Sequence, residues 1–315
     1  VYFLTKAPTP STLMKAFAQV HPFMILTVPL VIEKIIKGKV LPIINKPVMK
    51  VLWKTPGIKC LLHKKVRNTL LSAFGGELRH LIIGGAALNE EVEKCMHDMH
   101  FPYCVGYGMT ECAPLICVTP QPEEYKLGSC GKYLKEFLDV KIESADPQRI
   151  PGEIMVKGEM VMQGYYKNEK DTTAVLEPDG WMHTGDMGIM DPDGTVYIKG
   201  RCKTMILTDT GQNIYPEQIE DKLNNLPLVA ESLVLENGGK LYGLVVPDFA
   251  LCEKEHIDRT KLEEIMQENL KNLNSQVAAY ERLVSISIYP SEFEKTPKKS
   301  IKRYLYNVAK LGIQQ

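Results

Sequence analysis

A strand–turn–helix–strand pattern in the first third of the chain constrains the fold more than any other feature. The apolar run at 81–83 suits a buried strand and leads into small residues at 84–87. Asn89 stands where it can cap a helix over 90–99. A second apolar run, 101–105, follows at once. This order predicts a βαβ unit, and therefore an α/β protein with parallel strands.

The second apolar run ends in the hexapeptide GYGMTE at 106–111. Glycines let the main chain approach a ligand closely, and Tyr107, between two of them, offers a flat face for a nucleotide base. Thr110 and Glu111 add a hydroxyl for a phosphate oxygen and a carboxylate for a hard cation such as Mg²⁺. The same residues would also suit a turn at the end of a strand, with Glu111 favoured by the dipole of a helix start.

Four later stretches accompany these motifs. They read DGWMHTGD at 179–186, DPDG at 191–194, KGRCK at 199–203 and GQNIYPEQIE at 211–220. In this order and spacing, over nearly the whole chain, the motifs closely resemble the acyl-adenylate-forming superfamily of AMP-binding enzymes. That superfamily includes acyl-CoA synthetases, luciferases and the adenylation domains of peptide synthetases. The resemblance implies ATP or AMP, Mg²⁺ and coenzyme A as cofactors.

The resemblance also assigns roles to the first two motifs. The glycine-rich turn would border the adenine and the acyl tunnel, although a tight βα turn of small packing residues is the alternative. Tyr107 would stack on the adenine, Thr110 would contact the α-phosphate, and Glu111 would hold Mg²⁺, so that Thr110 and Glu111 are candidate catalytic residues. The nucleotide contacts implied here are Gly84, Gly85, Ala86, Tyr107, Gly108 and Thr110.

The later motifs receive roles in the same way. Asp186 would accept hydrogen bonds from both ribose hydroxyls, and the other Asp-Gly pairs read as turns. Arg201 would brace the ribose or phosphate with its fork of donors, or else be an ordinary surface arginine. Lys203 matches the position of the hinge between domains. Gly211 would line the path of the CoA pantetheine arm.

The adenylation lysine of the family falls on an irregular stretch, TPKKSIKR at 296–303. A strict alignment places Ser300 on that lysine. We take Lys299 as the catalytic lysine, and Lys298 and Lys302 remain alternatives. A solvated basic helix start without a catalytic role is also compatible with this stretch.

The organisation implied is the C-terminal part of a large adenylation domain, residues 1–201, followed by a small α+β lid domain, residues 202–315. The large part would combine βαβ layers with a β-hairpin or barrel-like subdomain, because short alternating runs separated by Gly, Pro and Asp follow residue 128. The chain looks like the C-terminal portion of a longer protein, lacking the upstream phosphate-binding loop. We therefore expect the fragment alone to be inactive.

The acyl substrate is suggested by the segment VPLVIEK at 28–34, which resembles long-chain acyl-CoA synthetases. The implied activity is ATP-dependent activation of a fatty acid to an acyl-adenylate and transfer to CoA. Two alternatives stay open: a fragment that binds nucleotide without turnover, and an enzyme that transfers the acyl group to a carrier protein.

Composition adds exclusions. Lys plus Arg equals Asp plus Glu at 38 each, which gives no global field that favours nucleic acid. Eight scattered cysteines without a metal-site spacing fit a reducing compartment, and we expect a cytoplasmic protein. The longest early apolar run, 23–32, is too short to span a bilayer, which leaves peripheral contact with a membrane open.

Overall fold

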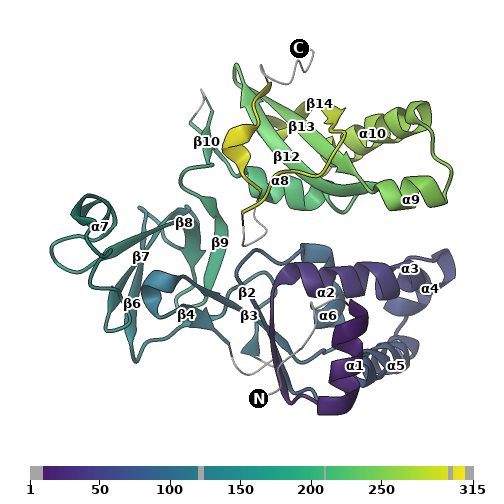
Figure 1. Cartoon of the computed structure of the whole chain (residues 1–315), viewed down its shortest axis with the longest axis horizontal. Helices are drawn as coiled ribbons and strands as arrows, with labels where there is room; N and C mark the ends of the chain where they lie inside the picture. The colour runs from purple at the N-terminus through teal and green to yellow at the C-terminus, as the bar shows by residue number, and fades with distance from the viewer. Residues whose placement is uncertain (1–9, 120–123, 209–210, 297–300, 309–315) are drawn as a thin grey trace. The chain divides into compact units, whose positions relative to one another are not determined.

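The chain forms two compact units. The computed structural model describes residues 10–119, 124–208, 211–296 and 301–308 (Figure 1). Unit 1 holds residues 1–184 and 188–198, and unit 2 holds residues 185–187 and 199–315. The main chain passes between the units within two strands, β8 (Met182–Met190) and β9 (Val196–Arg201).

Unit 1 is organised around a mixed sheet whose strands follow the sequence order. They are β1 (Met24–Thr27), β2 (His80–Gly84), β3 (Tyr103–Gly108), β4 (Leu115–Val118) and β5 (Lys132–Tyr133). The first three are parallel, and β4 and β5 join antiparallel. The predicted βαβ unit is β2, α6 (Glu90–Asp98) and β3. The Asn89 side chain accepts a hydrogen bond from the Val92 amide at 3.2 Å, which is the predicted cap.

Helices α1 to α5 lie to one side of this sheet in Figure 1. They are α1 (Pro10–Val20), α2 (Pro29–Ile35), α3 (Leu41–Ile44), α4 (Pro47–Lys54) and α5 (Ile58–Ala73). A π-helical turn, Ile36–Val40, joins α2 to α3. Residues 38–65 are thus mostly helical, with breaks between the helices. Prolines at the first turns of α2, α3 and α4 explain the breaks, because proline begins a helix readily but cannot continue one.

A second sheet contains β6 (Leu138–Glu143), β7 (Gly152–Gly158), β8 and β9 in that order. Residues 185–187 of β8 and 199–201 of β9 belong to unit 2, and the rest of the sheet belongs to unit 1. β6 and β7 pair antiparallel from Leu138 with Gly158 to Glu143 with Glu153. Within the ranges that the structure describes, these strands form an open sheet and not a closed barrel. The short helix α7 (Glu169–Val175) between β7 and β8 was not predicted.

Unit 2 is a three-stranded sheet with two main helices. β12 (Val229–Asn237) and β13 (Lys240–Pro247) form an antiparallel hairpin, and β14 (Leu283–Ile288) pairs parallel to β13. Gly238 and Gly239 make its turn with φ of 60° and 75°, values that glycine adopts without strain. α8 (Pro216–Leu223) packs on β12, and α10 (Arg259–Asn274) packs on β14. The smaller elements are β10 (Ile206–Leu207), β11 (Asn213–Ile214) and α9 (Phe249–Lys254).

The end of the described chain is held to α8 by a buried ion pair. Glu220 of α8 contacts the guanidinium of Arg303, and its other oxygen accepts the Val234 amide at 2.6 Å. Burial raises the pKa of Glu220 to about 7, while the nearby Arg303 opposes that rise. Residues 301–308 are therefore part of the fold of unit 2.

Candidate active site

Two sequence motifs meet at one edge of the unit 1 sheet. β2 and β3 run parallel with Ile83 opposite Val105 and Gly84 opposite Gly106. The glycine-rich turn and GYGMTE therefore begin side by side at the carboxyl ends of neighbouring strands. In open α/β sheets this edge is where ligands bind.

Main-chain contacts explain the glycines at this edge. A Cβ on Gly84 would lie 3.0 Å from the carbonyl oxygen of Gly106, and a Cβ on Gly108 would lie 1.9 Å from that of Pro114. Gly85 has φ of 87°, a conformation that L-residues rarely adopt. The three glycines thus have structural reasons to be glycine, which hold whether or not a nucleotide lies against them.

The side chains at this edge differ in exposure. Ala86 and Thr110 are exposed, so both are accessible to a ligand. Tyr107 is only 7% exposed and belongs to the hydrophobic core of unit 1. Its ring thus contributes to packing, and stacking on a base would use the small part of the ring that reaches the surface.

The turn after β2 is also tied to the segment that suggested a fatty-acid substrate. Glu33 lies in α2, and its Oε1 accepts the Asn89 amide at 2.9 Å. Asn89 is the cap of α6, four residues after Gly85. The glutamate of the VPLVIEK segment therefore has a structural role beside the candidate nucleotide edge.

Glu111 is held by a partner that the sequence reasoning missed. It is half-buried in a 3₁₀ turn, Thr110–Cys112, and its Oε1 accepts a hydrogen bond from the Tyr165 hydroxyl at 2.9 Å. The Met162 amide donates to the Glu111 carbonyl at 2.8 Å. Desolvation and the Glu111 carboxylate raise the pKa of Tyr165, so the phenol stays a donor at neutral pH. The motif GYYKN at 164–168 was the available signal.

Asp186 and Arg201, which come from two separate motifs, form an ion pair. Arg201 Nε lies 2.9 Å from Asp186 Oδ1. The side chain of Asp186 is 10% exposed and that of Arg201 is 61% exposed. Backbone pairing of Cys202 N with the Gly185 carbonyl, at 2.9 Å, holds the two strands together here. A buried carboxylate needs such a partner, and the exposed guanidinium leaves donors facing solvent.

The remaining residues of the predicted hinge and CoA loop are exposed. Lys203 lies in a turn directly after β9. Gly211 closes a turn in which its amide donates to the Thr208 carbonyl at 2.9 Å. It has φ of 82°, and a Cβ there would meet nothing within 4 Å. Residues 209–210 of that loop lie outside the described residues.

The candidate residues for the adenylation lysine divide into two groups. Lys298, Lys299 and Ser300 lie outside the described residues. Lys295 and Ile301, on either side, form an antiparallel bridge. Lys302, one of the alternatives, has its Nζ 3.3 Å from Glu294 Oε2 and is half-buried. Its ammonium is therefore already paired with a carboxylate of unit 2.

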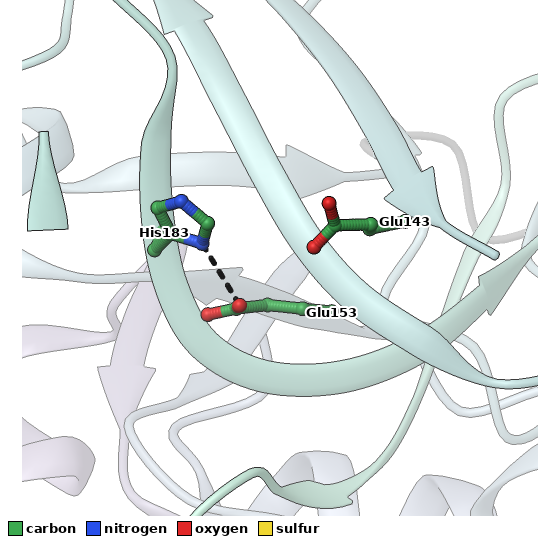
Figure 2. Close-up of side chains that lie close together, drawn as sticks. All are labelled: Glu143, Glu153 and His183. Atoms are coloured by element: carbon green, nitrogen blue, oxygen red, sulfur yellow. Dashed lines mark hydrogen bonds and ion pairs between the residues drawn. The ribbon is translucent and has the colours of Figure 1, made fainter. Parts of the chain in front are cut away.

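His183, from the same motif as Asp186, lies between carboxylates. Its Nδ1 is 2.9 Å from Glu153 Oε2 and its Nε2 is 3.1 Å from Glu177 Oε1. Hydrogen bonding to Glu153, and then to Glu177, raises the pKa of His183. Glu143 stands opposite Glu153 in the β6–β7 pair, and one ligand atom from each of Glu143, Glu153 and His183 lies within 4.8 Å of the others (Figure 2).

The hydrogen bonds to Glu153 and Glu177 favour the protonated form of the His183 ring. An imidazolium donates from both nitrogens and has no lone pair for a metal ion. The raised pKa of His183 therefore favours an ion-pair cluster that joins β7, β8 and the turn before β8.

Comparison with known proteins decides the family. The sequence profile described as "AMP-binding enzyme" matches residues 1–166, and that described as "AMP-binding enzyme C-terminal domain" matches residues 203–308. The chain belongs to the AMP-binding enzyme family. This confirms the resemblance found in the sequence motifs.

Relatives in the AMP-binding enzyme family differ in the acid that their names specify. The chain is 32% identical over 232 residues to 4-coumarate-CoA ligase 2 of Narcissus pseudonarcissus, covering 69% of this chain and 39% of that protein. It is 32% identical over 204 residues to long-chain-fatty-acid–CoA ligase 4 of Saccharomyces cerevisiae, covering 63% of this chain and 29% of that protein. The matched regions thus cover well under half the length of these relatives.

The fold agrees with solved AMP-binding enzymes. The o-succinylbenzoate CoA synthetase MenE of Bacillus subtilis, solved with its acyl-adenylate intermediate, superposes with a TM-score of 0.67 at 23% identity. The match covers 94% of this chain and 53% of that one. The mixed α/β fold predicted from the sequence is therefore confirmed.

Proposed function

We propose that the complete protein activates a long-chain fatty acid as an acyl-adenylate and transfers the acyl group to coenzyme A. The observation that carries this proposal is the meeting of the glycine-rich turn and GYGMTE at the carboxyl ends of β2 and β3. Family membership supports it, and the relatives named above are CoA ligases or synthetases.

In the first half-reaction a carboxylate oxygen would attack the α-phosphorus of ATP, and pyrophosphate would leave. Asp186 would bind the ribose hydroxyls, with Arg201 neutralising its charge and presenting its remaining donors to ribose or phosphate. Thr110 would donate to the α-phosphate. Positioning and neutralisation of charge supply most of the catalysis in such transfers.

The carboxylate of Glu111 fits Mg²⁺, because it is a hard oxygen donor oriented by Tyr165 and Mg²⁺ in nucleotide sites takes one or two carboxylates beside phosphate oxygens. Bound there, the ion would neutralise phosphate charge. Glu111 is thus the residue of this chain proposed to hold the metal.

The second half-reaction would use the other unit. The thiol sulfur of CoA would attack the acyl carbon, and AMP would leave. We propose that residues 202–315 act as a lid that rotates about Lys203, since Lys203 is exposed and follows directly on β9. Lys299 would serve adenylation in one orientation, and Gly211 would line the CoA path in the other.

Long-chain fatty acid is favoured as the substrate by the VPLVIEK segment, and relatives named for long-chain fatty acids support it. Relatives named for 4-coumarate and 2-succinylbenzoate provide the competing acids.

The test is ATP–pyrophosphate exchange by the complete protein with each acid in turn. We expect exchange with long-chain fatty acids and little with 4-coumarate or 2-succinylbenzoate, followed by thioester formation when CoA is added. Exchange with an aromatic acid but with no long-chain fatty acid would overturn the proposed substrate class. ATP binding without exchange would favour a non-catalytic nucleotide-binding protein, and exchange without a CoA thioester would favour a carrier-protein acceptor.

A further inference from the structure

One segment of unit 1 carries a charge unlike the rest of the chain. No Asp or Glu occurs between Glu33 and Glu77. Ten cationic residues lie in the same stretch, namely Lys34, Lys37, Lys39, Lys46, Lys50, Lys54, Lys59, Lys64, Lys65 and Arg67. Because the chain has a formal net charge of +0, the rest of it carries −10, which is 0 minus 10.

These cations face solvent. All are exposed except Lys37 and Arg67, which are half-buried. Leaving Lys37 aside, none of these cations takes part in an ion pair found among the described residues. A concentration of positive charge on one part of a neutral protein attracts an anionic surface.

The same helices also expose large apolar side chains. Val48 and Val51 of α4 are 71% and 67% exposed, and Leu61 of α5 is 72% exposed. Ile43 of α3 and Ile58 of α5 are exposed as well. Val48 with Val51, and Ile58 with Leu61, are three residues apart, so each pair lies on one helix face.

Side chains packed between α4 and α5 define the inner side of these helices, and the exposed apolar residues lie on the outer side. Trp53 of α4 is buried, and its ring lies 4.1 Å from that of His63 on α5. His63 Nε2 is 3.3 Å from the Trp53 carbonyl oxygen. α4 packs on α3 and α5, and Figure 1 shows the three helices together in unit 1. α4 therefore has a packed inner face and an outward face of valines and lysines.

We propose that the outward face of α3, α4 and α5 binds the surface of an anionic phospholipid membrane. Lysines would neutralise lipid headgroups, and the valines, leucine and isoleucines would enter the headgroup–acyl boundary. Stable peripheral binding needs two such signals, and this face supplies both. None of the helices that the structure describes is long and apolar enough to cross a bilayer.

The composition of the face favours lipid over nucleic acid. Single-stranded nucleic acid is bound by aromatic side chains that stack on bases. Between residues 34 and 67 the only Phe, Tyr or Trp is Trp53, and it is buried. Exposed aliphatic side chains gain nothing from phosphates but gain free energy in hydrocarbon. The proposal does not depend on the proposed enzymatic function.

The test is co-sedimentation of the chain with vesicles of phosphatidylcholine alone, or with a quarter of the lipid replaced by phosphatidylserine. We expect binding to the anionic vesicles only, weakened by added NaCl because salt screens the attraction. The double variant Lys50→Glu/Lys54→Glu should weaken binding at least about tenfold, and Val48→Ser/Val51→Ser should weaken it severalfold.

The matched control is Lys170→Glu/Lys254→Glu. It changes the net charge equally on exposed lysines of α7 and α9, and Lys254, like Lys54, lies in the last turn of its helix. We expect it to bind vesicles as the parent does, and circular dichroism would verify that every variant is folded. Equal losses in both lysine variants, or equal binding to neutral vesicles, would overturn the proposal. Binding to a short DNA that the valine variant leaves unchanged, without vesicle binding, would assign the face to nucleic acid instead.

Discussion

The strand-end edge of unit 1 and the loop region of unit 2 place glycine for different reasons. Gly84 and Gly108 have neighbouring main chain where a Cβ would be, whereas Gly211 has open space around it and only a positive φ. At Gly84 and Gly108 of unit 1, packing of the main chain leaves no room for a side chain. At Gly211 of unit 2, packing leaves room for a side chain. A matched motif can therefore reflect a requirement of folding at one site, whereas at another site function is the main reason for the residue.

The largest expected effect tests the packing constraint. Gly108→Ala should destabilise unit 1 by about 3 kcal/mol, because its Cβ would lie 1.9 Å from the Pro114 carbonyl oxygen and main chain must move. Urea unfolding would measure the change. Gly38→Ala is the control, since a Cβ there meets nothing within 4 Å, and it should be close to neutral. Similar stability of the two variants would remove the distinction drawn above.

The second prediction concerns the ion pair between Asp186 and Arg201. Asp186→Ala in the complete protein should weaken ATP binding by about 1.5–3 kcal/mol, roughly tenfold or more, because hydrogen bonds to a charged group are lost. Isothermal titration with ATP would measure it. Asp179→Ala, at a turn in the same motif, should bind ATP normally. An ATP affinity within twofold of the parent would mean that Asp186 is a structural residue that pairs with Arg201.

The third prediction compares two histidines of unit 1 by pH. Because the pKa of His183 is raised in the fold, its contribution to stability is complete below the unfolded value of 6.5 and is lost as pH rises through the folded pKa. His183→Gln should therefore lower the free energy of unfolding by about 1–2 kcal/mol at pH 6 and by less at pH 9. His97→Gln, on α6, is the control. A loss independent of pH would mean that packing, and not charge, is what His183 provides.

The smallest effect on stability is expected at Gly211. Gly211→Ala should cost about 1 kcal/mol, the strain of a left-handed conformation without a clash. If this loop lines the CoA path, thioester formation should fall more than pyrophosphate exchange in the complete protein. Single-turnover measurement of each step checks this, and equal changes in both would place Gly211 outside the CoA path.

Local signals predicted much of the fold. The Asn89 cap and the strand–turn–helix–strand order at 81–108 each depend on neighbours in the sequence. The order of the motifs indicated the family, and each motif is itself a continuous stretch of sequence.

Contacts between distant residues could not be predicted. The Tyr165 hydroxyl reaches Glu111 across 54 residues, and His183 reaches Glu153 across 30. No spacing rule connects such positions, because they meet only when separate strands and turns have packed. The same reason explains why the burial of Tyr107 was not foreseen from the two glycines beside it.

The hydrogen bond from the Asn89 amide to Glu33 joins parts of the chain that are 56 residues apart. The bond joins α2 to the first turn of α6 and to the loop before that turn. Local unfolding of either element breaks this hydrogen bond and exposes the Glu33 carboxylate and the Asn89 amide to water. The local unfolding of α2 and that of the start of α6 are therefore coupled. In amide hydrogen exchange α2 and the start of α6 would then behave as one cooperative unit.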